Sequence, residues 1–278
     1  MDSSTLRIII FLTIIGVMAV WETLAAKRSG SQPKAKRWLG NISLIVVDTL
    51  VVRLLIPAGA IGAAAWADVH HIGLLHQFGM PDMASVIIAI ILLDMAIYAQ
   101  HVFFHAVPIL WRLHMVHHAD CDLDVSSGLR FHPVEILLSM LIKLALVVLI
   151  GAPVLAVLLF EAILNGMAMF NHANVRMPGA MDRLLRIFVV TPDMHRVHHS
   201  VLVAETNSNF GFNLSLWDRM FGTYTAQPSA GHQNMTIGLT QFQQQPTYRL
   251  DWMLALPFVG KIGQYPWLNR TSGEQKEP

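Results

Sequence analysis

Long apolar stretches, separated by short polar segments, run through the first 171 residues of the chain. A helix needs about 20 apolar residues to cross a bilayer, and five stretches approach this length: residues 6–26, 41–66, 84–105, 134–150 and 153–171. Only Gly151-Ala152-Pro153 separates the last two, which are therefore expected to form a tight helical hairpin. The pattern predicts an all-α, polytopic membrane helical bundle with about four or five spanning or hairpin helices.

A basic cluster directly follows the first apolar stretch: Lys27, Arg28, Lys34, Lys36 and Arg37. A cleaved signal peptide carries its positive charge before the apolar run, so this stretch is interpreted as a retained anchor. Because basic segments beside spans stay in the cytoplasm, the N-terminus is predicted to lie outside. The ends of spans 84–105 and 153–171 and the start of span 134–150 then all face the cytoplasm.

Two charged residues, Asp48 and Arg53, interrupt the second apolar stretch. A charge is costly inside the hydrocarbon of a bilayer. The two residues are therefore interpreted as lying at the membrane interface or as pairing inside the protein. The membrane core of this stretch would then be residues 54–66.

The pattern changes after residue 175 to mixed polar and apolar segments. Residues 180–190 and 250–259 are predicted to form helices that lie on the membrane surface. The chain is accordingly divided into N-terminal membrane helices with a connecting loop (1–83), a histidine-rich domain with a helical cap on the cytosolic side (84–224), and a C-terminal interfacial segment with a polar tail (225–278).

Composition supports a membrane protein and excludes several classes of site. Apolar residues make up 54% of the chain and charged residues 13%, against about 25% charged in a soluble domain, and the mean hydropathy is +0.50. A net charge of +1 gives no support to a nucleic-acid partner. The single cysteine, Cys121, excludes an intrachain disulfide and a cysteine-rich zinc or iron–sulfur site.

The fourteen histidines are the unusual feature of this composition. Nine of them fall into four groups near the predicted cytoplasmic ends: His101-x3-His105, His114-x2-His117-His118, His172, and His195-x2-His198-His199. Residues four apart share one face of a helix, so His101 and His105 can point at the same ion. In each HxxHH group the last two rings diverge by about 100°, so one group can reach two neighbouring metals.

This pattern indicates a metal site. Neutral imidazole is the commonest protein metal ligand, and it suits iron, zinc, copper and nickel alike. A structural zinc ion uses about four ligands, so nine candidates indicate two ions with about four or five nitrogens each. His132, within RFHPVE, stays open as a weak ligand, as a hydrogen-bond partner of a ligand, or as a helix-start residue before Pro133.

Acidic and amide side chains are expected beside the ligands. Two divalent ions held only by imidazole would leave a large positive charge that needs compensation. Carboxylates and amides that hydrogen-bond to the ligand rings would also orient them. The candidates are Asp94, Glu135, Asp193 and Asn174, with Asp120, Asp122 and Asp124 directly after the second histidine group.

These motifs, in this order, resemble the membrane fatty acid hydroxylase or sterol desaturase superfamily. Besides HxxxH and two HxxHH boxes, the resemblance rests on RFHPVE (130–135), TPDMHRVHHS (191–200) and NFGFNLSLWDRMFGTY (209–224). It covers residues 94–224. It implies a membrane helical protein with two non-haem iron ions on the cytosolic side, which activates O2 as co-substrate and hydroxylates or desaturates a C–H bond of a fatty acyl, sterol or related lipid.

The resemblance also implies a ligand set, namely His101, His105, His114, His117, His118, His172, His195, His198 and His199. The first box has three intervening residues where the fatty acid 2-hydroxylase branch has four, and the second histidine of that branch near His172 is missing. These departures favour the sterol-oxidase or uncharacterised bacterial branches. The chain contains no cytochrome b5-like domain, so a separate electron-transfer protein is expected.

A second interpretation stays open, namely a histidine-rich membrane protein that binds or transports metal without oxygen chemistry. A transporter places its ionisable ligands near the midplane, often between repeats. Here the ligands gather at one membrane face and no repeat is visible. A membrane metalloprotease is disfavoured because HExxH is absent. The sequence therefore favours the lipid oxygenase.

Overall fold

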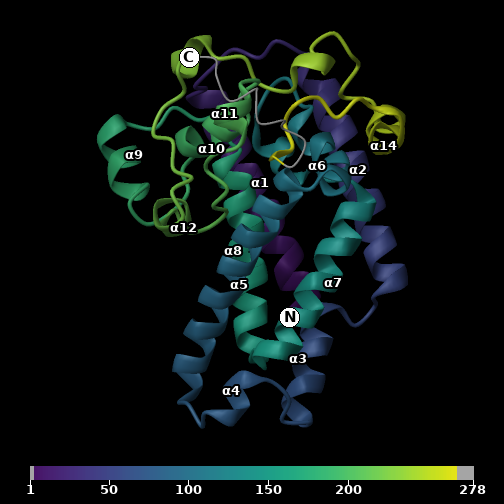
Figure 1. The fold of residues 1–278 in the computed structure, drawn as a ribbon, viewed down its shortest axis with the longest axis vertical. Helices are drawn as coiled ribbons and strands as arrows, with labels where there is room; N and C mark the ends of the chain where they lie inside the picture. Colours follow the sequence, from purple (N-terminus) through teal and green to yellow (C-terminus); the bar gives the residue numbers. More distant parts are fainter. Residues whose placement is uncertain (1–2, 268–278) are drawn as a thin grey trace.

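The computed structural model of the chain describes residues 3–267, and these residues form helices joined by turns, with isolated β-bridges but no strands. Figure 1 shows an elongated helical bundle with shorter helices and loops gathered at one end. The prediction of an all-α polytopic bundle is confirmed.

Four segments of the described chain are long and apolar enough to cross a membrane. Three are single helices, and the fourth contains α2 (Lys34–Leu55), α3 (Gly59–Val69) and α4 (Leu74–Gln77). The single helices are α5 (Asp82–Ala106), α7 (Pro133–Ile150) and α8 (Val154–Asn171). The predicted hairpin turn between α7 and α8 is present, and Gly151 takes the left-handed conformation there, with φ 69°.

Two of the five predicted spans differ from the structure in their continuity or length. The stretch 41–66 is divided between α2 and α3, because the residue before a proline is pushed out of the helical conformation, and Ile56 before Pro57 has φ −135° and ψ 65°. The first stretch forms α1 (Ser3–Leu24), whose apolar part, Ile8–Leu24, is shorter than the four candidate spans.

The remaining helices build a cap on one end of the bundle (Figure 1). The segment 180–190 forms a helix shorter than predicted, α9 (Gly179–Leu185), whereas α14 (Leu250–Val259) has the predicted bounds. The position of both helices on a membrane surface remains a prediction. The cap elements are α6 (Pro108–His118), η1 (Val125–Leu129), α9 (Gly179–Leu185), α10 (Pro192–His198), α11 (Val203–Thr206), α12 (Leu216–Met220), α13 (Gly231–Asn234), η2 (Thr240–Phe242) and α14 (Leu250–Val259).

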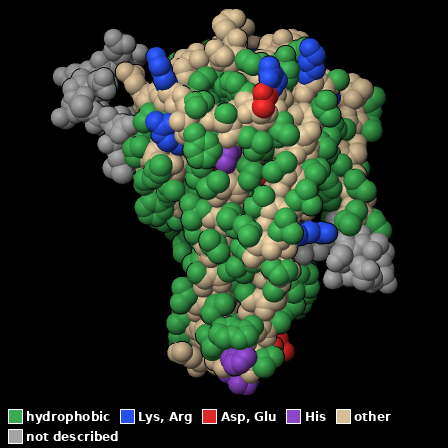
Figure 2. Space-filling model, turned by 90° about the vertical axis from the view of Figure 1, so that its right-hand side faces the viewer, with side chains coloured by type: hydrophobic (Ala, Val, Ile, Leu, Met, Phe, Trp, Pro, Cys, Tyr) green, Lys and Arg blue, Asp and Glu red, His purple; other side chains and the backbone are tan. Residues whose placement is uncertain are grey.

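The bundle and the cap have separate hydrophobic cores. In the bundle, small residues such as Ala60, Ala64, Ala89 and Ala156 are fully or almost fully buried and pack with Phe160, which allows helix backbones to approach closely. In the cap, aromatic and long apolar side chains of α6 and α14 pack together. Figure 2 shows apolar side chains over the elongated half, whereas most of the visible lysines and arginines lie at the cap end.

Candidate metal centre

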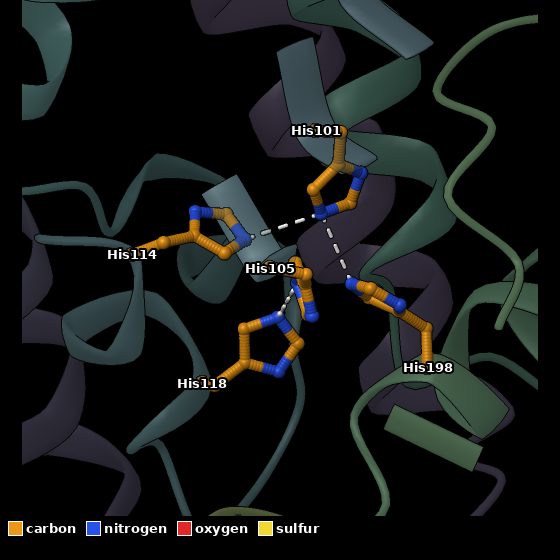
Figure 3. A group of neighbouring side chains, drawn as sticks. All are labelled: His101, His105, His114, His118 and His198. Carbon is orange, nitrogen blue, oxygen red and sulfur yellow. Dashed lines mark hydrogen bonds between the residues drawn. The ribbon is translucent and has the colours of Figure 1, made fainter. Parts of the chain in front are cut away.

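Nine histidines from four helical segments meet at the junction of the bundle and the cap. Within each of two groups, the ring nitrogens that face inward all lie within 4.8 Å of one another, and every member is buried. The five-histidine group, drawn in Figure 3, is His101, His105, His114, His118 and His198. The four-histidine group is His117, His172, His195 and His199. The structure thus brings together all nine histidines that the sequence predicted as ligands.

Helical spacing explains how each HxxHH motif serves both groups. On α6, His114 and His118 are four residues apart and enter the five-histidine group, while His117 points to the other group. In the third box the division is reversed: His195 on α10 and His199 at its C-cap enter the four-histidine group, and His198 on α10 enters the other. Consecutive helical residues differ by about 100° in direction, so adjacent histidines cannot serve one centre.

Backbone carbonyls determine which ring nitrogen carries hydrogen in several of these histidines. A carbonyl oxygen can only accept, so the Nδ1 atom that contacts it must be the donor, and Nε2 of the same neutral ring then has a free lone pair. The Nδ1-to-carbonyl pairs are His101 to Phe210 (2.8 Å), His198 to Ser208 (2.7 Å), His117 to Arg130 (3.0 Å) and His172 to Ala168 (2.7 Å).

The Nε2 atoms of these rings face one another at short range. Nε2 of His101 lies 3.0 Å from Nε2 of His198, and Nε2 of His117 lies 3.0 Å from Nε2 of His172. Two lone pairs at this separation repel each other unless a positive charge lies close to both. The donor set therefore fits a metal cation in each group, and neutral imidazole is the form that binds metal.

Burial keeps the histidines of the cap in this neutral form. It lowers the pKa of His114 to about 3. Burial, reinforced by neighbouring histidines, also lowers the pKa of His118, His195 and His199 well below its usual value. Near neutral pH these rings are consequently ready to bind metal without first losing a proton.

Glu135 is the acidic candidate that contacts a histidine of the centre. Its Oε1 accepts a hydrogen bond of 2.7 Å from Nδ1 of His114, and both side chains are buried. Such a carboxylate holds the ring in one tautomer and orientation and raises the basicity of the opposite nitrogen. This contact matches the position expected for Glu135 from the sequence.

The other three candidates bind the scaffold around the centre. Asp94 accepts hydrogen bonds from Nε1 of Trp217 (2.8 Å) and from the amide of Leu214 (3.2 Å). It therefore anchors the segment whose carbonyl at Phe210 orients His101. Asp94 supports the histidines through the backbone rather than by touching them.

Asp193 and Asn174 hold the segment that follows α1. Asp193 pairs with Lys27 at 2.7 Å and with Arg196. Asn174 donates from Nδ2 to the carbonyl of Arg28 at 2.8 Å. Both side chains thus fasten the basic cluster of the chain to the cap.

His132 begins a helix and belongs to neither histidine group. Its Nδ1 accepts from the amide of Val134 at 3.2 Å, and its Nε2 lies 3.2 Å from the carbonyl of Leu254. It is the N-cap of α7, and Pro133 is the first helical residue. Of the three roles that the sequence left open, the helix-start role agrees with this geometry.

Two residues of the centre were missed in the sequence, although both lie in or beside a recognised motif. Oδ1 of Asn207 lies 3.2 Å from Nδ1 of His105, just before the NFGF motif. Arg130, fully buried in RFHPVE, donates to the carbonyls of Val116 and Thr247 at 2.7 Å each. Arg130 thereby fixes the loop whose carbonyl orients His117.

A cavity of about 480 Å³ extends from the centre into the bundle. Its walls come from α2, α3, α5, α7 and α8, and most of its lining side chains are apolar. His101, His114 and His117 reach its inner end, so the cavity touches both histidine groups. A volume of this size is typical of a small-molecule pocket.

Replacing Glu135 with glutamine is expected to weaken metal binding by about 10- to 100-fold, because His114 loses its charged partner. Competition with a chelator, followed by metal analysis of the purified protein, measures this change. Glu161→Gln is the matched control, since Glu161 lines the same cavity but pairs with Lys143. Equal metal affinity in Glu135→Gln and the unmodified protein would contradict the role of Glu135.

Comparison with known proteins also identifies the segment that contains the clustered histidines. The sequence profile of the fatty acid hydroxylase family matches residues 86–223, a range that contains all nine clustered histidines. This part of the chain belongs to the fatty acid hydroxylase family. No solved structure matches the chain with statistical significance.

Three similar proteins illustrate the range of this family. The ornithine lipid hydroxylase OlsE of Rhizobium tropici is 28% identical over 238 residues, which are 84% of this chain and 70% of that protein. The alkylglycerol monooxygenase of Danio rerio is 31% identical over 54% of this chain and 32% of its own length. The cholesterol 25-hydroxylase of Rattus norvegicus is 26% identical over 52% of this chain and 48% of its own length. The family match and these relatives together place the chain among the oxygenases.

Proposed function

We propose that this chain is an integral membrane di-iron, O2-dependent oxygenase that acts on a C–H bond of a lipid. The observation that carries the proposal is the pair of histidine groups at the inner end of a largely apolar cavity. Five and four imidazoles suit two metal ions, and the cavity suits an apolar substrate. A transport protein would not require a largely apolar cavity of this volume beside its ligands.

The nine histidines would hold the two iron ions, and the iron would supply the redox chemistry that activates O2 and cleaves the C–H bond. The residues of the chain would orient the histidine ligands for this chemistry. Backbone carbonyls fix the tautomers of His101, His117 and His172, and Glu135 orients His114. The apolar walls of the cavity exclude water from the reacting carbon.

The substrate is a lipid, and hydroxylation is the favoured outcome. The cavity lies within the part of the bundle whose helices can cross the membrane, so a lipid could enter from the bilayer. The named relatives are hydroxylases and monooxygenases acting on ornithine lipid, alkylglycerol and cholesterol. Desaturation would begin with the same hydrogen removal and is the other possible outcome of the same site.

The centre lies on the cytoplasmic side, and the N-terminus lies outside. The basic cluster after α1 belongs to the same end of the molecule as the histidines, since Lys27 pairs with Asp193 beside the third histidine box. By the positive-inside rule, this end stays in the cytoplasm. Electrons come from a separate protein, and the catalytic domain comprises residues 84–224, between the N-terminal membrane helices and the C-terminal interfacial segment.

Mass spectrometry of lipids from cells grown under ¹⁸O₂ tests the proposal. We expect cells expressing the chain to contain a lipid that carries the label, and cells expressing His198→Ala to lack it. The purified protein should hold about two iron ions per chain. A product that lacks two hydrogens and the label would indicate desaturation. Bound zinc or nickel, with no change in the lipids when an electron donor is supplied, would instead support a metal-binding or transport protein.

A further inference from the structure

Asp48 is a buried carboxyl group inside the membrane bundle. It lies on α2, its residue is only 4% exposed, and it lines the cavity that leads to the histidines. Its Oδ1 atom is buried and has no hydrogen-bond partner among the described residues. An unsatisfied buried oxygen is costly, and an acidic group inside a membrane protein is usually functional.

No cation of the described chain neutralises this carboxyl group. The sequence left open a pairing of Asp48 with Arg53, but no ion pair joins them in the part of the chain that the structure describes. Lys143 lines the same cavity, and it pairs with Glu161 at 3.3 Å. The interpretation of Asp48 as an internally paired residue is therefore wrong.

Two pairs of polar side chains that line the same cavity bind each other. Nε2 of Gln100 donates to Oγ of Ser139 at 2.9 Å, and Oε1 of Glu135 accepts from His114. The other oxygen of Glu135, Oε2, is also buried without a partner among the described residues. Asp48 on α2 and Glu135 on α7 thus each place a buried oxygen without a partner among the described residues in the wall of the same cavity.

We propose that Asp48 accepts a hydrogen bond from the substrate, so that the cavity selects lipids carrying a hydroxyl, amide or ammonium donor. A donor supplied by the ligand satisfies the oxygen that has no partner among the described residues. Since Asp48 and His101 line the same cavity, one bound lipid can reach Asp48 with its donor group and the histidines with the carbon that is oxidised. This inference rests on the proposed function, which makes the cavity a substrate site.

A competition between two lipids that differ in one donor tests the inference. The purified full-length protein is placed in phosphatidylcholine nanodiscs, because phosphatidylcholine has no hydrogen-bond donor of its own. Equal amounts of 1-hexadecanol and hexadecyl methyl ether are added, and mass spectrometry measures the ratio of the two probes retained by the protein. We expect the alcohol to be preferred by about tenfold.

Variants of Asp48 show whether this preference depends on its carboxyl group. Asp48→Leu should retain both probes equally. If the leucine variant does not fold, the isosteric Asp48→Asn replaces it, and we expect this variant to show a weaker preference for the alcohol. Asp68→Asn is the matched control, because Asp68 is exposed and lies outside the cavity lining, and it should keep the full preference. Equal retention of both probes by the unmodified protein would overturn the proposal, as would an unchanged preference in both Asp48 variants.

The binding measurement does not depend on turnover, so it separates this inference from the proposed function. A preference for the alcohol that requires Asp48, together with unlabelled lipids under ¹⁸O₂, would support the donor site and contradict the oxygenase. Labelled lipids without any donor preference would support the oxygenase and contradict the role of Asp48.

Discussion

Replacing His172 with alanine is expected to remove one of the two metal ions and to abolish lipid oxidation. His172 lies outside the three histidine boxes, yet its Nε2 lies 3.0 Å from the Nε2 atoms of both His117 and His195. Without it, the four-histidine group retains three nitrogens. Loss of a group that only supports a ligand already lowers metal affinity or activity by about 10- to 100-fold. Loss of a ligand itself should therefore lower activity by at least about a hundredfold.

Metal analysis of the purified variant and its labelled lipid product measure both effects. We expect the metal content to fall from about two ions per chain toward one. His132→Asn is the control, because His132 is a buried helix cap outside both groups and asparagine is also a good N-cap. If His172→Ala kept two ions and full activity, His172 would not be a ligand.

Replacing Arg37 with methionine is expected to destabilise the protein by about 3–5 kcal/mol. The guanidinium of Arg37 makes two hydrogen bonds of 2.8 Å to Asp120 and one of 2.5 Å to Asp124, and all three side chains are almost fully buried. Although burial raises it, the interaction with Arg37 lowers the pKa of Asp120 to about 2. Removal of the guanidinium leaves two buried carboxylates without their main cation, which explains the size of the effect.

Thermal unfolding of the detergent-solubilised protein measures this loss. A destabilisation of this size should lower Tm by at least about 6 °C for a chain of this length. Arg249→Met is the matched control, because Arg249 and its partner Asp251 are both exposed, and water and salt screen their interaction. The Tm of this variant should stay close to that of the unmodified protein. An unchanged Tm in Arg37→Met would show that Arg37 and its carboxylates do not hold α2 to the loop after the second histidine box.

Helical periodicity explains why so much of the metal centre was predictable. The spacings of HxxxH and HxxHH determine the directions of rings on one helix, whatever surrounds them. The sequence therefore predicted that each HxxHH motif could serve two neighbouring metals, and α6 and α10 have this arrangement. It did not predict which histidines join which group, because that depends on how α5, α6, α8 and α10 pack against one another.

The supporting residues were less predictable, because proximity in sequence is a poor guide to contact in space. Glu135 lies 21 residues after His114 and touches it, whereas Asp193, two residues before His195, pairs with Lys27 and Arg196. Asp120 and Asp124 follow the second box directly, yet they bind Arg37. Each of these carboxylates is matched with a partner supplied by a distant segment of the chain.

The sequence by itself determined the helical class, most of the apolar segments and the identity of the nine clustered histidines, because local periodicity and hydropathy govern these features. Only the tertiary structure decided the division of the histidines into five and four and the cap role of His132. It also decided that Oδ1 of Asp48 is buried without a partner among residues 3–267. The physical reason is that the hydrogen-bond partner of a buried polar group usually lies on another helix, which is distant in the sequence. Hydrogen-bond satisfaction is therefore a property of packing.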